Sequence, residues 1–161
     1  TTASACAHLS FIRSSWVRST SLASLVPSEC EAAPAPIAFA EAGVSAAEMD
    51  IAMIYDSFSI TVLTLLEDLG FCAKGEGGAW VQGGRLRFDR PNDGPALNTD
   101  GGGLSSNHPG MRGIFLLLEA TRQLRGESTS HVEDARLAIA HGNGGMLGGR
   151  HSAGTVILGR D

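Results

Sequence analysis

The sequence has no long apolar run, no basic cluster, and few aromatic residues or cysteines. Apolar stretches such as residues 114–118 are typical, whereas a helix that crosses a bilayer needs about 20 apolar residues. The 12 Lys and Arg residues are outnumbered by 17 Asp and Glu, which leaves a net charge of −5. These absences argue against a membrane span and against nucleic-acid binding.

The three cysteines, Cys6, Cys30 and Cys72, are an odd number without the spacing of a metal site. They cannot all pair, and no charged and then apolar segment at the start of the chain marks a signal peptide. We therefore expect reduced thiols and a cytoplasmic protein. The first residues, T-T-A-S-A, lack a starting Met, which favours a trimmed fragment or a shortened gene product.

The remaining composition is that of a folded domain. A chain of 161 residues with 43% hydrophobic and 18% charged residues can bury a core, which argues against disorder. The 21 glycines exceed the usual share of about 7%, but they cluster between apolar segments without a period, unlike collagen or linkers. We expect an irregular N-terminal remnant over residues 1–37, with one candidate edge strand, and a single domain over residues 38–161.

Apolar periodicity and turn residues predict alternating strands and helices. Short strands are expected at residues 50–55, 96–98, 136–140 and 155–158, and helices at residues 38–42, 45–48, 58–69 and 109–126. The helix at 58–69 is apolar nearly all round, which is typical of a helix packed on two sides. A surface hairpin is expected around Gly83 and Gly84. This order favours a sheet with parallel neighbours between helices, and an antiparallel final pair.

Three polar or glycine-rich segments follow predicted strands. They are Y-D-S-F at residues 55–58, G-G-G-L-S-S-N-H-P-G at 101–110 and H-G-N-G-G at 141–145. Open α/β sheets gather ligands at the carboxyl ends of their strands. We therefore expect a binding site built from these segments.

His108 is the most informative residue of these segments. With Pro109 at the first helical position, His108 lies beside the unpaired N–H groups of the helix start. The positive end of the helix dipole disfavours imidazolium, so the ring stays neutral near pH 7 and can accept a proton. A capping His without chemistry explains the sequence equally well.

The other two segments also have simpler interpretations. The run from Gly142 to Gly145 lets backbone N–H groups approach a bound oxygen, as an oxyanion hole requires, but a tight turn without a ligand explains it too. It lacks the Lys-Ser/Thr of a phosphate loop. Tyr55 is explained as a core aromatic, and Asp56 as a helix N-cap.

A metal site is not expected. His108, His141 and His151 are the nearest candidates for ligands, but no two of them are four residues apart on one helix. Cys72 has no adjacent His and is interpreted as an ordinary thiol.

Taken in order, the segments resemble the C-terminal half of a thiolase-fold protein: Y-D-S-F-S-I-T-V-L-T-L-L-E-D-L-G-F, then N-T-D-G-G-G-L-S-S-N-H-P-G-M-R-G, then H-G-N-G-G. The resemblance runs from about residue 38 to the end, and the most similar branch is the lipid-transfer-protein (sterol carrier protein x) type of thiolase-like acyltransferase. It implies an α/β fold with a mixed five-stranded sheet and helices on both faces, in three layers (α-β-α). It also implies that the nucleophilic Cys lies in a first half that this chain lacks.

The resemblance implies catalytic roles for His108, Tyr55 and His141. His108 matches the His-Pro-Gly histidine, which in thiolases activates the nucleophile and helps to bind the thioester oxygen. Tyr55 takes the place of an Asn that holds an oxyanion-hole water, and its phenol could donate directly or act as an acid. His141 stands where thiolases have their second catalytic Cys, and an imidazole can take over as base.

Asp56, Asn143, Gly144 and Gly145 are the substrate-binding candidates that the resemblance adds. Asn143 replaces a glycine of the family's Cys-x-Gly-Gly-Gly segment, and Gly144 and Gly145 keep its glycine-rich backbone. Asp56 lies in the loop that replaces Asn-Glu-Ala-Phe. The missing Cys argues against ordinary thiolysis or Claisen condensation.

The function implied is that of a thiolase-like acyl-CoA acyltransferase domain, which forms or cleaves a carbon–carbon bond. The alternatives are a retro-aldol lyase subunit acting on side-chain acyl-CoAs, or a non-catalytic module for acyl-CoA binding or assembly. No cofactor is expected beyond coenzyme A thioester as substrate. Expected partners are further copies of the chain, a first-half thiolase chain, or an OB-fold acyl-CoA-binding protein that carries its own zinc. Whether the isolated chain is an enzyme is left open.

Overall fold

The computed structural model describes residues 17–24, 34–89, 94–106, 110–144 and 152–160. Its centre is a five-stranded sheet in the order β1-β5-β4-β2-β3. The strands are β1 (Val17–Ser24), β2 (Ile51–Ile54), β3 (Ala96–Leu97), β4 (Leu137–Gly144) and β5 (Ser152–Gly159). The helices are α1 (Pro34–Ala42), α2 (Ser59–Asp68), α3 (Gly77–Trp80) and α4 (Arg112–Leu124), with 3-10 turns η1 (Ala46–Glu48) and η2 (Gln82–Gly84).

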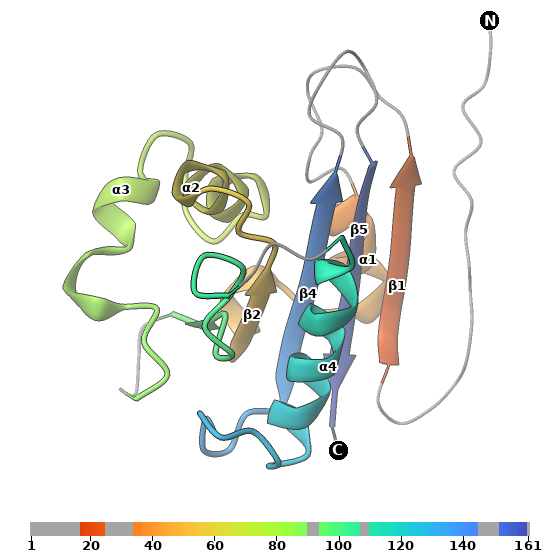
Figure 1. Cartoon of the computed structure of the whole chain (residues 1–161). Helices are drawn as coiled ribbons and strands as arrows, with labels where there is room; N and C mark the ends of the chain where they lie inside the picture. The colour runs from red at the N-terminus through yellow and green to blue at the C-terminus, as the bar shows by residue number, and fades with distance from the viewer. Residues whose placement is uncertain (1–16, 25–33, 90–93, 107–109, 145–151, 161) are drawn as a thin grey trace, which may run out of the picture.

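The sheet is mixed, as predicted (Figure 1). Strand β2 pairs parallel with both β3 and β4, while β4 pairs antiparallel with β5. Strand β1, from the N-terminal segment, adds an antiparallel edge next to β5. The predictions of parallel neighbours and of an antiparallel final pair are confirmed.

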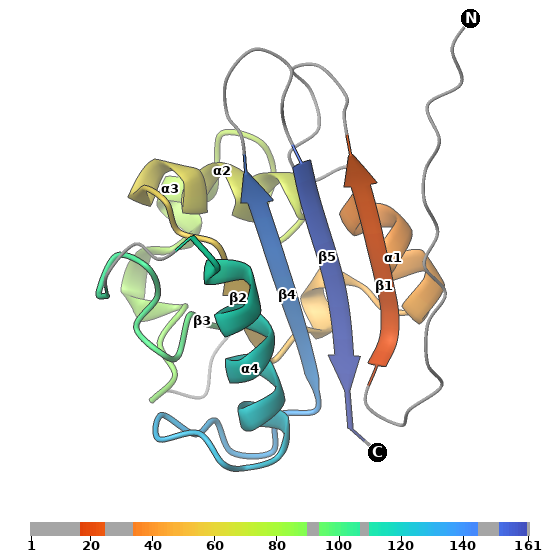
Figure 2. The same ribbon diagram turned by 45° about the vertical axis from the view of Figure 1, so that its right-hand side comes forward.

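Helices cover both faces of the sheet. Ile51 and Met53 of β2 belong to the core that includes Leu116 and Leu124 of α4. The alternate residues, Ala52 and Ile54, belong to the core formed with α1 and α2. Figure 2 shows α4 on one face of β4 and α1 on the other face of the sheet. The predicted three-layer α/β fold is therefore confirmed.

Glycines end the helices where the sequence predicts. Gly43, Gly70 and Gly126 directly follow the last turns of α1, α2 and α4, with φ of +69°, +84° and +71°. Glycine adopts this left-handed conformation without the steric cost of a Cβ. The capping box at Ser45 is present too, since its backbone N–H donates to the Glu48 carboxylate at 2.8 Å.

Two helices begin at other residues than predicted. Helix α1 starts at Pro34, four residues before the predicted start, because proline fits the first helical turn, where its missing N–H needs no partner. Helix α4 starts at Arg112, with Met111 as its N-cap, and not at Pro109.

The hairpin predicted around Gly83 and Gly84 is wrong. That segment forms the short helix α3 and the turn η2. Trp80 holds the segment together, since its ring lies 6.1 Å from that of Phe71 and the Arg85 guanidinium lies 5.2 Å above it. The segment lacks the alternating apolar pattern of a strand. Trp80 packs it against the core instead, so it does not need to pair with a strand.

Among the described residues, the two-sided packing predicted for α2 is only partly present: α2 packs on the sheet and also meets α3, where the Gly77 N–H donates to the Glu67 carboxylate at 3.0 Å. Val62, Leu65 and Leu66 are buried against the sheet, but Ile60 is 64% exposed. Phe58, just before the helix, is 62% exposed. Within the described residues, no helix has both the length and the apolar content needed to cross a membrane.

Candidate active site

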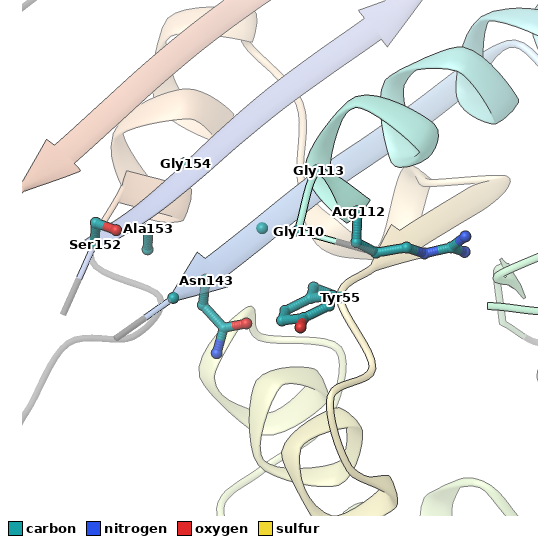
Figure 3. A pocket seen from close by; sticks show the side chains of 10 residues that line it. Tyr55, Gly110, Arg112, Gly113, Asn143, Ser152, Ala153 and Gly154 are labelled. Atoms are coloured by element: carbon teal, nitrogen blue, oxygen red, sulfur yellow. The ribbon is translucent and has the colours of Figure 1, made fainter. Parts of the chain in front are cut away.

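A cavity of about 430 Å³ opens at the end of the sheet where β2 and β4 finish and α4 begins. Its walls come from four parts of the chain, namely the end of β2, the start of α4, the end of β4 and the start of β5. The residues that line it are Tyr55, Gly110, Arg112, Gly113, Gly142, Asn143, Gly144, Ser152, Ala153 and Gly154. In Figure 3, Tyr55 approaches from the end of β2 and Asn143 from β4, beneath the N-terminus of α4.

The three segments selected from the sequence meet at this cavity. Tyr55 comes from the first segment, Gly110 ends the second, and Asn143 and Gly144 belong to the third. His108 and Gly145 lie outside the described residues. The carboxyl ends of parallel β2 and β4 lie at the same edge, which explains the convergence.

The third segment is a strand and not the loop that its glycines indicated. Residues 141–144 are the end of β4, where Gly142 pairs with Gly154 and Gly144 with Ser152 of β5. The antiparallel ladder with β5 engages the N–H groups of alternate residues in this run, and Gly145 lies outside the described residues, so the oxyanion hole at Gly142 to Gly145 stays a prediction. A glycine run judged from the sequence alone indicates a turn. Here, pairing with the eight-residue strand β5 holds Gly142 and Gly144 extended.

His141 is fully buried and does not line the cavity. Its Nδ1 lies 2.8 Å from the Thr155 hydroxyl, directly across the ladder on β5. Since side chains alternate along β4, His141 is on the same face as Ile139, which packs with α1 and α2. The structure thus brings Tyr55 and Asn143 together at the cavity but not the His141 ring.

Asp56 holds the second segment in place. Its two carboxylate oxygens accept hydrogen bonds from the N–H groups of Gly103 and Leu104, at 2.7 and 3.0 Å. The prediction that Asp56 caps α2 is wrong, because Phe58 is the N-cap there. A Cβ on Gly102 would lie 2.1 Å from the Asp56 carboxylate. The glycines at 102 and 103 therefore let this carboxylate approach the backbone.

Asn98 extends the sheet with its side chain. Its amide donates to the Ile54 carbonyl and accepts from the Ile54 N–H, both at 2.8 Å. This pair continues the β3–β2 ladder by one step, while a φ of +45° at Asn98 turns the backbone away. The residue before Tyr55 is thus fixed from the neighbouring segment.

The start of α4 is fixed by a partly buried ion pair. One nitrogen of the Arg112 guanidinium lies 2.8 Å from each oxygen of Asp100, and the Arg112 side chain is 6% exposed. In Figure 3 this side chain extends away from the cavity, so Arg112 contributes position more than contact. Asp100 also accepts from the Gly102 N–H at 3.0 Å.

Sequence reasoning missed Asn98, Asp100 and Arg112 as parts of the site. All three lie in or beside the motif N-T-D-G-G-G-L-S-S-N-H-P-G-M-R-G. The opposite charges of Asp100 and Arg112 flank the His-Pro-Gly segment, which is the one signal that could have paired them. No spacing rule predicts that an Asn side chain replaces a strand residue.

The cavity combines groups that stabilise negative charge with a largely uncharged wall. The Tyr55 hydroxyl is a donor, and the N-terminus of α4 presents the positive end of its dipole. Hydrogen-bond donors aimed at the place where negative charge develops stabilise an oxyanion. The site is therefore suited to a substrate whose carbonyl oxygen becomes negative during reaction.

Residues 14–160 match the family described as thiolase C-terminal domain-like. The chain belongs to this family. An acetyl-CoA acetyltransferase of Methanothermobacter thermautotrophicus is 39% identical over 113 residues, which are 69% of this chain and 29% of that protein. Sterol carrier protein 2 of Rattus norvegicus is 35% identical over 114 residues, which are 69% of this chain and 20% of that protein.

Among solved structures, the Ltp2-ChsH2(DUF35) aldolase is similar, with a TM-score of 0.62 and 31% identity over 76% of this chain and 30% of that chain. These likenesses confirm the resemblance to thiolase-fold proteins of the sterol carrier type. This member of the thiolase C-terminal domain-like family is short: the chain covers less than a third of the length of each of these relatives.

Proposed function

We propose that the chain supplies the C-terminal half of an active site that forms or cleaves a carbon–carbon bond of an acyl-CoA thioester. The observation that carries this proposal is the convergence of Tyr55, Gly110 and Asn143 on one cavity. Membership of the family, and likeness to an acetyltransferase and an aldolase, support the same class of reaction. Coenzyme A enters as the thioester substrate, and the chemistry uses no further cofactor.

In this proposal Tyr55 donates its phenolic proton to the thioester or enolate oxygen. The Tyr55 side chain lies on the cavity at the end of β2, and its backbone N–H donates to the His141 carbonyl at 2.9 Å. Asn143 and the backbone at Gly144 orient the substrate from β4. One well-placed oxyanion donor lowers a barrier by about 3–4 kcal/mol.

His108 is the proposed base, and Gly110 marks the cavity wall two residues beyond it. His141 is proposed as the second acid/base. Since its ring has no exposed surface here, that role requires a movement of the ring toward the cavity. Without such a movement, His141 acts through its contact with Thr155, which joins the two strands that carry Asn143 and Ser152.

A retro-aldol reaction is the form of this chemistry that suits the chain best. A base removes the proton from a β-hydroxyl group, the bond between the α and β carbons breaks, and a carbonyl product leaves. The remaining enolate thioester then takes a proton at its α carbon. No covalent acyl-enzyme is formed, so no Cys is needed, and the likeness to a solved aldolase supports this form.

A partner is part of the proposal. Apolar side chains at Met111, Ile114, Phe115 and Leu118 are 71%, 48%, 42% and 52% exposed along the outer side of α4. Exposed apolar stripes of this kind mark protein interfaces. We propose that a first-half thiolase chain or an OB-fold acyl-CoA-binding protein completes the site, in a cytoplasmic assembly that contains more than one copy of the chain.

The test is turnover of an acyl-CoA thioester by the complete assembly, purified with whichever chain accompanies this one. Tyr55→Phe and His108→Ala are each expected to lower turnover by about 10²–10³-fold or more. Ser57→Ala is the matched control, because the Ser57 hydroxyl contacts Thr61 on α2 and not the cavity.

Unchanged turnover in both variants would exclude the proposed roles. Binding of acyl-CoA without any turnover by the assembly would favour the non-catalytic module, which the exposed α4 stripe suggests as a second candidate.

A further inference from the structure

The cavity wall is made largely of residues without side chains. Five of its ten lining residues are glycine and a sixth is Ala153. The glycines are Gly110, Gly113, Gly142, Gly144 and Gly154. They come from the start of α4, the end of β4 and the start of β5, so no single turn explains all of them.

The backbone does not require glycine at four of these positions. Gly110, Gly113, Gly142 and Gly144 are absent from the described glycines with positive φ. A Cβ on Gly110 or Gly113 would meet no heavy atom within 4 Å. Gly102 is the contrast, since φ there is +70° and a Cβ would lie 2.1 Å from Asp56.

Close packing of α4 on the sheet does not require these glycines either. A Cβ on Gly142 would lie 4.0 Å from the Gly113 Cα, and a Cβ on Gly144 would lie 3.8 Å from the Ser152 hydroxyl. Both distances are ordinary van der Waals contacts. An alanine therefore fits at each position, and its methyl group would occupy the cavity.

Glycine at these positions lowers stability. It is a poor residue in a helix, where Gly113 lies, and in a strand, where Gly142 and Gly144 lie. A strand glycine that the fold does not need is typical of a place where a ligand approaches the backbone. We therefore interpret these glycines as residues that keep space in the cavity for a ligand.

We propose that Gly113 and Gly142, neighbours on the cavity wall where the start of α4 meets the end of β4, set the largest acyl group that the site accepts beside the thioester carbonyl. This inference rests on the proposed function. The cavity of about 430 Å³ exceeds what an acetyl group fills, and it lies within the range of small-molecule sites. Side chains at 113 or 142 would narrow it, because both residues line the cavity.

The test is calorimetric binding of acetyl-CoA and benzoyl-CoA to the complete assembly, purified with whichever chain accompanies this one. Gly113→Leu and Gly142→Ala are expected to weaken benzoyl-CoA at least tenfold and acetyl-CoA no more than twofold. Gly78→Leu is the matched control, because Gly78 lies in α3, away from the cavity, where a Cβ meets nothing within 4 Å. It is expected to change neither affinity.

The melting temperature is measured for each variant. Gly113→Ala is expected to melt at the same or a higher temperature than the parent chain, since alanine is the better helix residue. It serves as the second helix variant if Gly113→Leu does not fold. Equal losses for both thioesters, no loss for either, or failure of the parent assembly to bind benzoyl-CoA while it binds acetyl-CoA would overturn the inference. Turnover by the parent assembly tests the proposed function separately, so an assembly that turns over thioesters but shows no size-dependent loss in these variants overturns this inference alone.

Discussion

At the scale of single residues, the Asp56 carboxylate and Gly102 depend on each other, because they lie in close contact. The Asp56 carboxylate is 4% exposed and is occupied by the N–H groups of Gly103 and Leu104. Gly102 leaves the room that this carboxylate needs. A buried carboxylate with two backbone donors is stable, whereas one that loses a donor pays the desolvation cost of its charge.

Gly102→Ala is therefore expected to lower the free energy of unfolding by about 1–3 kcal/mol. The added Cβ would overlap the Asp56 carboxylate, and a φ of +70° is costly for alanine. Chemical denaturation measures the loss, with Gly78→Ala as the control in open space. In the double variant with Asp56→Ala the overlap is gone. The double variant should therefore lose less unfolding free energy than the sum of the losses in the two single variants. Full additivity would contradict the contact.

Cys72 gives a prediction about pH. Partial burial raises the pKa of the Cys72 thiol, and the nearby carboxylates of Glu67 and Glu76 raise it further. The thiolate is the reactive form, so a raised pKa leaves less of it at pH 8. Alkylation of Cys72, followed by mass spectrometry of its own peptide, should be slower than that of an ordinary cysteine, with a midpoint at higher pH.

Removing one negative charge should reverse part of this effect. Glu76→Gln is expected to lower the Cys72 pKa and to speed alkylation at pH 8, and added salt should act in the same direction by screening the carboxylates. Glu133→Gln, an exposed carboxylate elsewhere in the chain, is the control. Equal rates in all three proteins would show that charge does not reach Cys72.

At the scale of secondary-structure elements, helix α4 has apolar residues on two sides. Leu116, Ala120 and Leu124 face the sheet and are nearly fully buried. Leu118 and Ile114 belong to the outer stripe and are about half exposed. A helix with apolar residues on its outer side as well is expected to pack against a second protein surface on that side.

Leu116 and Leu118 allow a matched comparison, since they are the same residue two positions apart on α4. Leu116→Ala is expected to lower the free energy of unfolding by about 2–5 kcal/mol, because Leu116 is 1% exposed and a cavity would remain. Leu118→Ala should lower it by less than about 1 kcal/mol, because Leu118 is 52% exposed. Urea denaturation of the isolated chain measures both, and similar losses would contradict the two-sided helix.

The whole molecule has the sheet and the cavity but also an open apolar side. The chain covers 29% or less of its named acetyltransferase and sterol carrier relatives, and the α4 stripe is exposed in it. An exposed stripe drives association with whatever apolar surface is at hand.

The isolated chain is therefore expected to self-associate as its concentration rises. Phe115→Glu should reduce the mean mass measured by sedimentation, without a lower melting temperature, because Phe115 is 42% exposed and a charge there meets water in the monomer. Arg122→Glu, which reverses a charge at the exposed Arg122 of the same helix, is the control. An unchanged mass distribution in the Phe115 variant would show that the stripe does not mediate association.

Much of the fold could be predicted because local signals carry it. Glycines at 43, 70 and 126 end the helices, the four-residue apolar strand β2 is buried on both faces, and the alternation of elements leads to a parallel centre. Each of these depends on neighbours within a few residues, so periodicity and turn chemistry were sufficient. The segments that meet at the cavity were predicted for a related reason, since strand ends can be read from the chain.

What only the tertiary structure decided depends on partners far apart in the chain. Glycines 142 and 144 are extended because β5 pairs with them, and Asp56 binds the backbone near residue 103 instead of capping the helix beside it. His141 is buried because the face of β4 that carries it meets α1 and α2. The sequence by itself determined which segments approach one another, through apolar period and strand order. The direction of each side chain was decided by long-range pairing, because the free energy of a contact depends on both of its partners.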